Sequence, residues 1–582
     1  MAMGGVVMKG HSVLRACVLS FFLFALSCLA GAEETFTFIV MGDPQPYGAS
    51  PEQWQESYRK FLALIPEINR FSPDFLFLVG DYIVGAPYEG AELGRMWDEF
   101  DRVAARIEAP VWKVPGNHDI WNAESRRTYT KRYGPTYFSF DNHGCHFIGL
   151  DTELTTKETA LSPDQLAWLE TDLKTHSDAR FTFVFLHQPL WDVQPDRWNR
   201  DVHPLLAKYG VDFVFAGHDH IYRYDGMRDG VAYTITGGAN PLISGGELNG
   251  EFNHFIAVTV RQAAVYRAVI KAGAVLPYDV ATRQQIDLAN RMRTALSLMP
   301  LDAEALESSG KAVVATTVSN LFDQPARVEF RWTVAPDSGW LVSPETFVTT
   351  IAPGQTVPVE FKVGVRGTPS RPAPTCTAEI FVGDCGCGPV TRALALARKV
   401  ACPSEADPEV KPPSLPIDQH AFGPQAENTQ DFRAEASVMH DRTNLLFRIR
   451  VTDDAIVAGN PDDLRSGDTV AVAIYRGAPA PDACWTQAAF VRAGDPTSKP
   501  MFQPPVEGGA GTARRTDEGY EVEIAIPARA IKLSEAAPGE KFLCEIAVVD
   551  VDPGQKELSV YQWHSTSLFL AGIDGYGIVE VR

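Results

Sequence analysis

The sequence predicts an α/β unit in the first half of the chain, followed by two all-β sandwiches. Between residues 35 and 277, short β-rich runs alternate with helical stretches such as 51–71 and 162–175, a rhythm typical of layered α/β folds. From residue 312 onwards, apolar and polar residues alternate between turns without comparable helical stretches. A chain of 582 residues is also too long for one hydrophobic core, so we expect several domains.

The α/β unit is expected at residues 35–277, and a connecting helix at residues 278–304. The helix prediction rests on Ile286, Ala289 and Met292, which recur at helical spacing before Pro300 ends the pattern. The β-rich runs of the α/β unit are residues 36–41, 75–79, 111–114, 145–150, 181–186 and 211–216.

The rear half of the chain divides into two further β domains. Residues 305–402 are predicted to form an immunoglobulin-like β-sandwich, because alternating runs are separated by turn signals. Residues 403–416 are rich in proline and charge, the composition of a stiff linker. A second sandwich is then expected at residues 417–582, with strands at 444–452, 468–475, 520–526 and 542–551.

The first 32 residues have the pattern of a signal peptide. Lys9 and Arg15 precede the apolar run 16–30, and small residues up to Ala32 offer a cleavage site. A lipoprotein signal that uses Cys28 is the alternative. After cleavage we expect no transmembrane segment, because no later apolar run is long enough, and we therefore expect an exported protein that is periplasmic, extracellular or on the cell surface.

The net charge of −21 excludes some partners. Nucleic-acid duplexes and anionic lipid surfaces require clustered lysine and arginine, so we expect neither as a partner. A small phosphate ester remains a suitable substrate, because bound metal ions reverse the sign of the local field.

Four cysteines lie close together in the sequence: Cys376, Cys385, Cys387 and Cys402. In an oxidising compartment we expect them to form disulfides, with any of the three pairings, and a zinc site is the alternative. Cys484 and Cys544 are a further candidate pair, and Cys145 is expected to be a buried free thiol.

Polar side chains follow five of the predicted strands of the α/β unit. Each of these segments alone is common in turns, helix caps or structural histidine sites. Their occurrence in series, each after an apolar run, predicts one shared site. The segments are Gly42-Asp43-Pro44-Gln45, Gly80-Asp81, Gly116-Asn117-His118-Asp119, His187-Gln188 and Gly217-His218-Asp219-His220.

This donor set fits a pair of metal ions. A dinuclear site requires oxygen and imidazole ligands, a carboxylate that bridges, and open positions for water and a phosphoryl oxygen. Imidazole and carboxylate without thiolate suit two divalent or trivalent ions of manganese, iron or zinc. Such ions neutralise phosphoryl oxygens and lower the pKa of a shared water, which then attacks phosphorus in line.

The order Asp-x-Gln, Gly-Asp, Gly-Asn-His-Asp, His and Gly-His-x-His resembles the calcineurin-like metallophosphoesterase family, over roughly residues 36–270. The resemblance implies a four-layer metallophosphoesterase β-sandwich flanked by helices. It also implies that Asp81 bridges the two ions and that His118 faces the leaving group, with Asp119 either orienting the ring of His118 or capping a helix. The implied ligands are Asp43, Gln45, Asp81 and His220 for one ion, and Asp81, Asn117, His187 and His218 for the other.

Two positions depart from relatives of this kind. The family usually has histidine where this chain has Gln45, and the chain resembles the Asp-x-Gln subgroup. A neutral amide oxygen is a weaker ligand than imidazole, so the first metal is expected to bind less tightly or to be a harder ion. The tyrosine of purple acid phosphatases is out of register, because Tyr82 directly follows Asp81, and this disfavours a purple iron centre.

The expected function is hydrolysis of a phosphate ester, with a phosphomonoester as the first choice of substrate. A phosphodiesterase acting on nucleotides or lipid head groups is the alternative within this class. A carbohydrate-binding or adhesion protein without catalysis is the alternative outside it, and that alternative predicts missing ligands.

The last domain resembles the family 9 carbohydrate-binding modules. The resemblance rests on residues 445–449, 451–454, 467–468 and 519–527. It implies a polysaccharide or a cell-surface glycan as a partner. Sugar stacking requires exposed aromatic rings, for which Trp485 and Trp563 are candidates. A spacer domain without sugar binding is the alternative.

Overall fold

The computed structural model divides the chain into two compact units, Met1–Ile286 and Asp287–Arg582. The predicted signal peptide, Cys28, Cys484 and Trp485 lie outside the residues that the structure describes. The described residues are 35–47, 50–154, 158–240, 243, 245–296, 298–366, 373–397, 399–407, 410–422, 432–453, 456–457, 467–475, 487–492, 500–503, 505–531, 536–551, 559–564 and 576–582.

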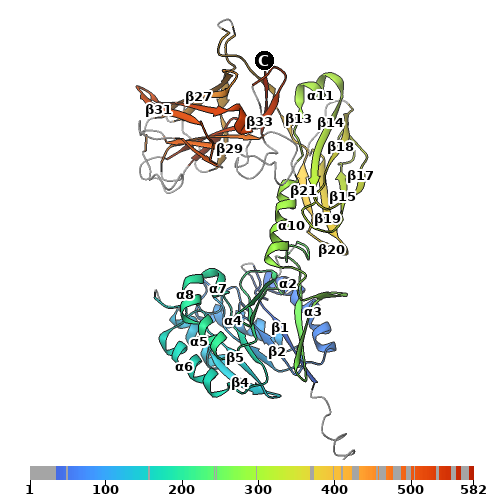
Figure 1. The fold of residues 1–582 in the computed structure, drawn as a ribbon, viewed down its shortest axis with the longest axis vertical. Helices are drawn as coiled ribbons and strands as arrows, with labels where there is room; N and C mark the ends of the chain where they lie inside the picture. The colour runs from blue at the N-terminus through green and yellow to red at the C-terminus, as the bar shows by residue number, and fades with distance from the viewer. Residues whose placement is uncertain are drawn as a thin grey trace, which may run out of the picture. The chain divides into compact units, whose positions relative to one another are not determined.

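Two six-stranded sheets form the centre of the first unit (Figure 1). The first sheet has the order β12-β11-β10-β1-β2-β3, with β1 (Thr35–Met41), β2 (Phe75–Leu78), β3 (Val111–Lys113), β10 (Phe255–Arg261), β11 (Ala264–Lys271) and β12 (Ala274–Pro277). The second has the order β4-β5-β6-β7-β9-β8, with β4 (Phe138–Asn142), β5 (Cys145–Gly149), β6 (Thr182–Phe185), β7 (Phe213–Ala216), β8 (Tyr222–Arg228) and β9 (Val231–Thr236). Strands β1, β2 and β3 run parallel to one another, as do β5, β6 and β7.

Helices cover the outer face of each sheet. Buried side chains from α2 (Pro51–Ser57), α3 (Arg59–Arg70), α4 (Gly90–Ala104) and α5 (Ala123–Tyr133) pack on the first sheet. Those from α6 (Pro163–Thr175), α7 (Leu190–Val193), α8 (Pro195–Asp201) and α9 (His203–Lys208) pack on the second. The predicted start of α6 is confirmed, because the Ser162 side chain accepts a hydrogen bond from the backbone N–H of Gln165.

The alternation of residue types along the strands explains the four layers. Successive strand residues point to opposite faces, and in β2 the phenylalanines alternate with leucines. Phe77 stacks on Phe185 of the other sheet with ring centroids 3.8 Å apart, whereas Leu76 and Leu78 belong to the core beneath the helices. Aromatic rings therefore join the two sheets and aliphatic side chains join each sheet to its helices. This arrangement confirms the predicted fold of the first unit.

The second unit begins within the predicted connecting helix and contains two β regions. The helix is α10 (Arg283–Ala295), followed by β13 (Leu301–Asp302), which pairs with β22 (Leu396–Ala397), and by α11 (Ala303–Ser309). The first β region has one sheet of β14 (Lys311–Ser319), β18 (Thr356–Val365) and β16 (Trp340–Ser343). Its other sheet has β17 (Thr346–Ile351), β15 (Ala326–Thr333), β19 (Thr375–Val382), β20 (Cys385–Gly386) and β21 (Val390–Ala393).

The C-terminal β region also has two sheets around one core. The larger sheet contains β23 (Lys399–Cys402), β25 (Gln419–Phe422), β28 (Thr469–Tyr475), β29 (Gln487–Arg492), β30 (Met501–Gln503), β33 (Lys541–Asp550), β34 (Ser559–Gln562) and β35 (Gly577–Val581). The smaller contains β24 (Leu415–Ile417), β26 (Phe432–His440), β27 (Asn444–Asp453), β32 (Gly519–Pro527) and β31 (Ala510–Thr516), and the short helix η1 (Ala528–Ile531) follows β32. The predicted succession of two all-β sandwiches after the α/β unit is thus confirmed.

The proline-rich stretch 403–416, predicted as a linker, begins directly after one strand of the C-terminal region and ends within another. Residues 399–402 already form β23, which pairs in parallel with β35, and Leu415–Ile417 form β24 beside β26. The carbonyl of Pro403 accepts a hydrogen bond from His440 N–H at 3.0 Å. Proline lacks a backbone donor but keeps its carbonyl acceptor, so a proline-rich segment can still run along the edge of a sandwich.

The expectation that Cys376 and Cys402 form disulfides is wrong, because both are free thiols. Cys376 lies on β19 opposite Arg392 of β21, whereas Cys402 lies on β23 within the core of the C-terminal region. Each side chain is buried in a different hydrophobic core, which explains their closeness in sequence without a bond. Cys145 is a buried free thiol, as expected, and Cys544 is free as well.

No helix among the described residues is both long enough and apolar enough to cross a membrane.

Candidate metal centre

The predicted site residues follow the carboxyl ends of strands from both sheets of the first unit. Asp43 and Gln45 follow β1, Asp81 follows β2, and the segment 117–119 follows β3. His187 follows β6 of the second sheet, and His218 and His220 follow β7. Because carboxyl ends of parallel strands lie at one edge of a sheet, these segments meet where the two edges face each other.

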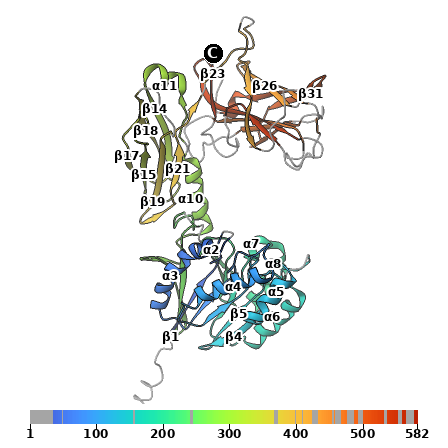
Figure 2. The ribbon, with the colours of Figure 1, turned by 180° about the vertical axis from the view of Figure 1, so that it is seen from behind.

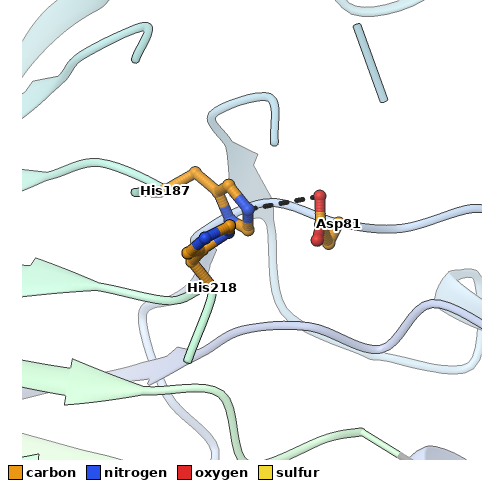
Figure 3. Close-up of side chains that lie close together, drawn as sticks. All are labelled: Asp81, His187 and His218. Carbon is orange, nitrogen blue, oxygen red and sulfur yellow. Dashed lines mark ion pairs between the residues drawn. The ribbon is translucent and has the colours of Figure 1, made fainter. Parts of the chain in front are cut away.

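Two groups of possible metal ligands share one carboxylate. Asp81, His187 and His218 form the first group, and Asp43, Asp81 and His220 form the second, with the ligand atoms of each group within 4.8 Å of one another. Figure 3 shows the imidazoles of His187 and His218 beside Asp81, with His187 Nε2 at 3.2 Å from Asp81 Oδ1. Asp81 therefore occupies the position that a bridging carboxylate requires.

The two amide residues extend these groups. Asn117 Oδ1 lies 3.1 Å from His187 Nε2 and 3.0 Å from His218 Nδ1, so the Asn117 oxygen joins the first group. The carboxamide of Gln45 lies 3.1 Å from His220 Nε2 in the second group. With its oxygen facing His220, the Gln45 nitrogen donates to the backbone carbonyl of Asp43 at 2.9 Å. All seven predicted ligands thus lie in one place, as two sets of four that share Asp81.

Backbone carbonyls orient the two histidines that matter most for the chemistry. His187 Nδ1 lies 2.8 Å from the carbonyl of Val79, which leaves Nε2 to face Asp81 and Asn117. His118 Nδ1 lies 2.7 Å from the carbonyl of Val84. A carbonyl only accepts hydrogen bonds, so each ring carries a proton on Nδ1. Nε2 is then the ring nitrogen that is available to a metal ion or a substrate.

The backbone around the ligands has a conformation that few residues adopt. Asp43, Asp81 and His218 have φ angles of 62°, 57° and 71°, which lie in the left-handed region. Such conformations cost about 1–3 kcal/mol each and persist where the surrounding structure imposes them. Here they turn three donor side chains toward one point immediately after their strands end.

Burial and charge in the site favour bound cations. Burial acts to lower the pKa of His187, but the charge of Asp81 and its hydrogen bond raise that pKa to about 10. Burial and the Asp81 charge also raise the pKa of Asp43 well above its usual range, against the opposing effect of His187. Protons are therefore retained because positive charge is required beside these buried carboxylates. Metal ions would supply that charge, so the donor set fits them.

His218 and His220 have lowered pKa values, which favour neutral rings. Burial, followed by the charge of His187, lowers the pKa of His218 to about 4. Burial likewise lowers the pKa of His220. Neutral imidazoles offer a lone pair, which is the form that binds metal ions.

The predicted orienting role of Asp119 is wrong. Its carboxylate is fully buried and accepts hydrogen bonds from the backbone N–H groups of Asp81, Tyr82 and Gly116, all at 2.8 Å. The Val84 carbonyl holds the His118 ring instead. Asp119 therefore joins the loops after β2 and β3 and positions Asp81 through its backbone.

Replacing Asp119 with asparagine is expected to destabilise the first unit by about 2 kcal/mol, because one buried N–H would face the new amide NH₂. The measurement is urea-induced unfolding of the full chain, followed by a probe of the first unit. Asp98→Asn is the control, since Asp98 forms an exposed ion pair with Arg132 and its loss should cost less than about 1 kcal/mol. Equal stability of the two variants would contradict the role given to Asp119.

Tyr82 is turned away from the ligands. Its hydroxyl lies 2.6 Å from the carbonyl of Val114 and accepts a hydrogen bond from Gly80 N–H at 3.0 Å. The phenol is fully buried and packs on Phe100 of α4. The contacts of Tyr82 are thus with the loops and helix below the ligands. This agrees with the sequence prediction that Tyr82 does not replace the tyrosine of purple acid phosphatases.

The sequence patterns missed a polar pair beside the site. Tyr47 follows Gln45 by two residues, and its hydroxyl accepts a hydrogen bond from Asn240 Nδ2 at 3.2 Å. Burial raises the pKa of Tyr47, and the charges of Asp81 and Asp43 raise it further. The closeness of Tyr47 to Gln45 was visible in the sequence, but nothing signalled a partner 193 residues away.

Among the described residues of the C-terminal region, Trp563 differs from the expectation of an exposed ring. Trp563 is only 4% exposed and belongs to the hydrophobic core, so it cannot stack on a sugar. A groove of about 300 Å³ lies on the smaller sheet, and its lining combines polar residues, among them Asp441, Arg448, Thr512 and Glu523, with apolar residues such as Met439.

Two regions of the chain match known protein families. Residues 36–222 match the family model of the calcineurin-like phosphoesterases. Residues 409–568 match that of the carbohydrate family 9 binding domain-like proteins. Both family resemblances are thereby confirmed.

Two relatives of the first region are phosphatases. Serine/threonine-protein phosphatase CPPED1 of Mus musculus is 26% identical over 217 residues, which cover 33% of this chain and 68% of that protein. Tartrate-resistant acid phosphatase type 5 of Rattus norvegicus is 25% identical over 250 residues, covering 37% of this chain and 75% of that protein. Among solved structures, a carbohydrate-binding module family 9 from Caldicellulosiruptor kristjanssonii in complex with cellotriose is 13% identical, with a TM-score of 0.25, and covers 32% of this chain and 94% of that chain.

Proposed function

We propose that this chain, which carries a calcineurin-like phosphoesterase domain at residues 36–222, is an exported phosphoesterase that hydrolyses phosphate monoesters at a pair of metal ions. The observation that carries the proposal is the sharing of Asp81 by two complete ligand groups. The proposed ligands are Asp43, Gln45, Asp81 and His220 for one ion, and Asp81, Asn117, His187 and His218 for the other. Manganese, iron and zinc all suit such donors.

Each protein group has a definite task in this proposal. Two bound cations would neutralise phosphoryl oxygens and lower the pKa of a water molecule. Asp81 holds both positions at a fixed separation, and its Oδ1 accepts the backbone N–H of His118 at 2.9 Å. The Val84 carbonyl keeps the Nδ1 proton of His118 in place, so in the imidazolium form the second proton is on Nε2, and this proton would pass to the leaving oxygen and leave a neutral ring.

Export and glycan binding are parts of the same proposal. The signal-peptide pattern of residues 1–32 supports export. The match of residues 409–568 to the carbohydrate family 9 binding domain-like proteins supports a polysaccharide or cell-surface glycan as the partner of the tail. Because Trp563 is buried, we place sugar contacts in the groove beside Arg448 and Glu523, where hydroxyl groups meet hydrogen-bonding side chains.

Hydrolysis of a chromogenic phosphomonoester and the matching diester tests the proposal. Metal-stripped protein should be inactive and should recover activity with manganese, iron or zinc. His118→Gln is expected to lower kcat by about 10²–10⁴-fold, because proton donation to the leaving group is lost. His143→Gln is the matched control, since His143 lies beside Asp74 and Phe36.

The result also decides the subclass. Faster turnover of the diester would replace the monoesterase proposal with a phosphodiesterase acting on nucleotides or lipid head groups. Folded protein that hydrolyses neither ester with any of the three metals would overturn the catalytic proposal in favour of a binding protein.

A further inference from the structure

A second cluster of histidine and aspartate side chains lies at the opposite strand ends of the second sheet. His146 is at the start of β5, Asp141 is on the neighbouring β4, and Asp172 and His176 are at the end of α6. Figures 1 and 2 show β4, β5 and α6 together at this side of the first unit. The ligands of the candidate metal centre, by contrast, all follow the carboxyl ends of their strands.

The side chain of His146 is 1% exposed and lies between two carboxylates. Its Nδ1 is 2.7 Å from Asp141 Oδ1, and its Nε2 is 2.8 Å from Asp172 Oδ2. A neutral imidazole has only one N–H donor, so it cannot satisfy two ionised carboxylates at once. A positive charge must therefore lie at one of these contacts, as a proton or as a metal ion.

Asp172 determines which contact keeps its proton. Its Oδ1 accepts a hydrogen bond from the Ser139 hydroxyl at 2.8 Å, and its Oδ2 faces His146 Nε2. The backbone carbonyl of the same residue accepts a hydrogen bond from His176 Nδ1 at 2.9 Å. A proton on His146 Nε2 satisfies the more buried carboxylate, because the Asp172 side chain is 9% exposed and that of Asp141 is 60% exposed, and His176 carries a proton on Nδ1, which faces the carbonyl. The lone pairs of His146 Nδ1 and His176 Nε2 remain, and both nitrogens lie beside Asp141.

We propose that Asp141, His146 and His176 bind a zinc ion, with Asp172 orienting His146 through its carboxylate and His176 through its backbone carbonyl. One donor atom from each of the three ligands lies within 4.8 Å of the others. Two imidazole nitrogens and one carboxylate oxygen are a donor set that zinc accepts, with a fourth position for water. A histidine whose other nitrogen donates to a carboxylate is the usual arrangement around bound zinc.

The exposed side of the cluster allows an ion to enter. Asp141 has a side chain that is 60% exposed and that of His176 is 31% exposed, whereas His146 is held in place. The two imidazole rings stack with centroids 4.0 Å apart and an interplanar angle of 14°. His176 directly follows α6, and its Nε2 lies 3.9 Å from Asp141 Oδ2, the carboxylate that His146 Nδ1 also faces. The ion would then join the β4–β5 hairpin to α6.

The test is a comparison of zinc content between the full chain and a set of single variants. Each protein is stripped, dialysed against micromolar zinc and analysed for bound metal per chain. His176→Gln and Asp141→Asn are expected to bind one zinc fewer than the unchanged chain. Asp178→Asn is the control, because it removes an exposed carboxylate two residues from His176 and should leave the zinc content unchanged.

All of these variants keep the ligands of the dinuclear centre. A difference in zinc content between a variant and the unchanged chain therefore reports on the cluster around His146. Asp172→Asn should weaken the zinc affinity of this site by about 10–100-fold, because His146 loses the carboxylate that orients it. A thermal-unfolding scan with and without zinc provides a second measurement, since an ion that binds only the folded state raises Tm. Equal zinc content and equal zinc-dependent Tm shifts in the unchanged chain and in His176→Gln would overturn the proposal, and the charge beside His146 would then be a proton.

Discussion

Replacing Asp81 with asparagine is expected to lower ester hydrolysis by about a thousandfold or more, and the bound metal at the centre should fall below one ion per chain. Asp81 is the carboxylate that belongs to both ligand groups. Asparagine has nearly the same shape but is neutral, so the attraction that holds two cations side by side is lost. The amide can also offer only one oxygen, whereas a bridging carboxylate offers two.

Turnover of a chromogenic ester and metal content per chain are measured together on the same preparations. Asp98→Asn is the matched control, because Asp98 is an exposed residue of α4 and its substitution should leave both quantities unchanged. An asparagine variant that is folded and keeps more than a tenth of the activity would contradict the assignment of Asp81 as the shared ligand.

Replacing Gly116 with alanine is expected to lower the same activity at least a hundredfold and to weaken metal binding, although the added group is only a methyl. A Cβ at this position would overlap Asp81 Oδ1 and would lie 2.6 Å from the Asp81 amide nitrogen and 2.9 Å from Cδ2 of His187. Two ligands would have to move, and a displacement of about 1 Å is enough to cost about 10²-fold in rate.

Gly94→Ala is the control for this substitution. Gly94 lies within α4, and a Cβ there has no neighbouring heavy atom within 4 Å. Because alanine favours a helix more than glycine does, this variant should be as active as the unchanged chain and slightly more stable. Comparable activity of the two alanine variants would show that the approach of Gly116 to Asp81 is unimportant.

The motif segments predicted the candidate site well because their chemistry and their place in the fold are linked. Asp43, Asp81 and His187 each follow an apolar run, and parallel strands bring their carboxyl ends to one edge. The donor types then follow directly from the residue letters. The layered core was predictable for a related reason, since β-rich runs and helical stretches alternate along residues 35–277.

Other features depended on contacts between segments that are far apart in the chain. Asp119 was assigned to His118, its neighbour, but it binds backbone N–H groups of the loop after β2. The Tyr47–Asn240 pair and the histidine–aspartate cluster around His146 join different elements in the same way. A sequence motif specifies which donors and acceptors exist, but not which backbone groups will be left to pair with them.

In the second unit, too, the sequence predicted the type of domain but not the contacts between distant segments. Its sequence predicted two all-β sandwiches, because strands with alternating apolar and polar residues form a sheet with one apolar face. That face must be covered by a second sheet. The pairing of β23 with β35 placed residues 399–402 in the last sandwich, and burial placed Trp563 in its core. Residue order along this chain was sufficient for the fold class and for the seven clustered donors, since both follow from local periodicity and residue chemistry. Strand partners, buried aromatics and the hydrogen bonds that orient each ligand arise from long-range packing, which acts only once the chain has folded.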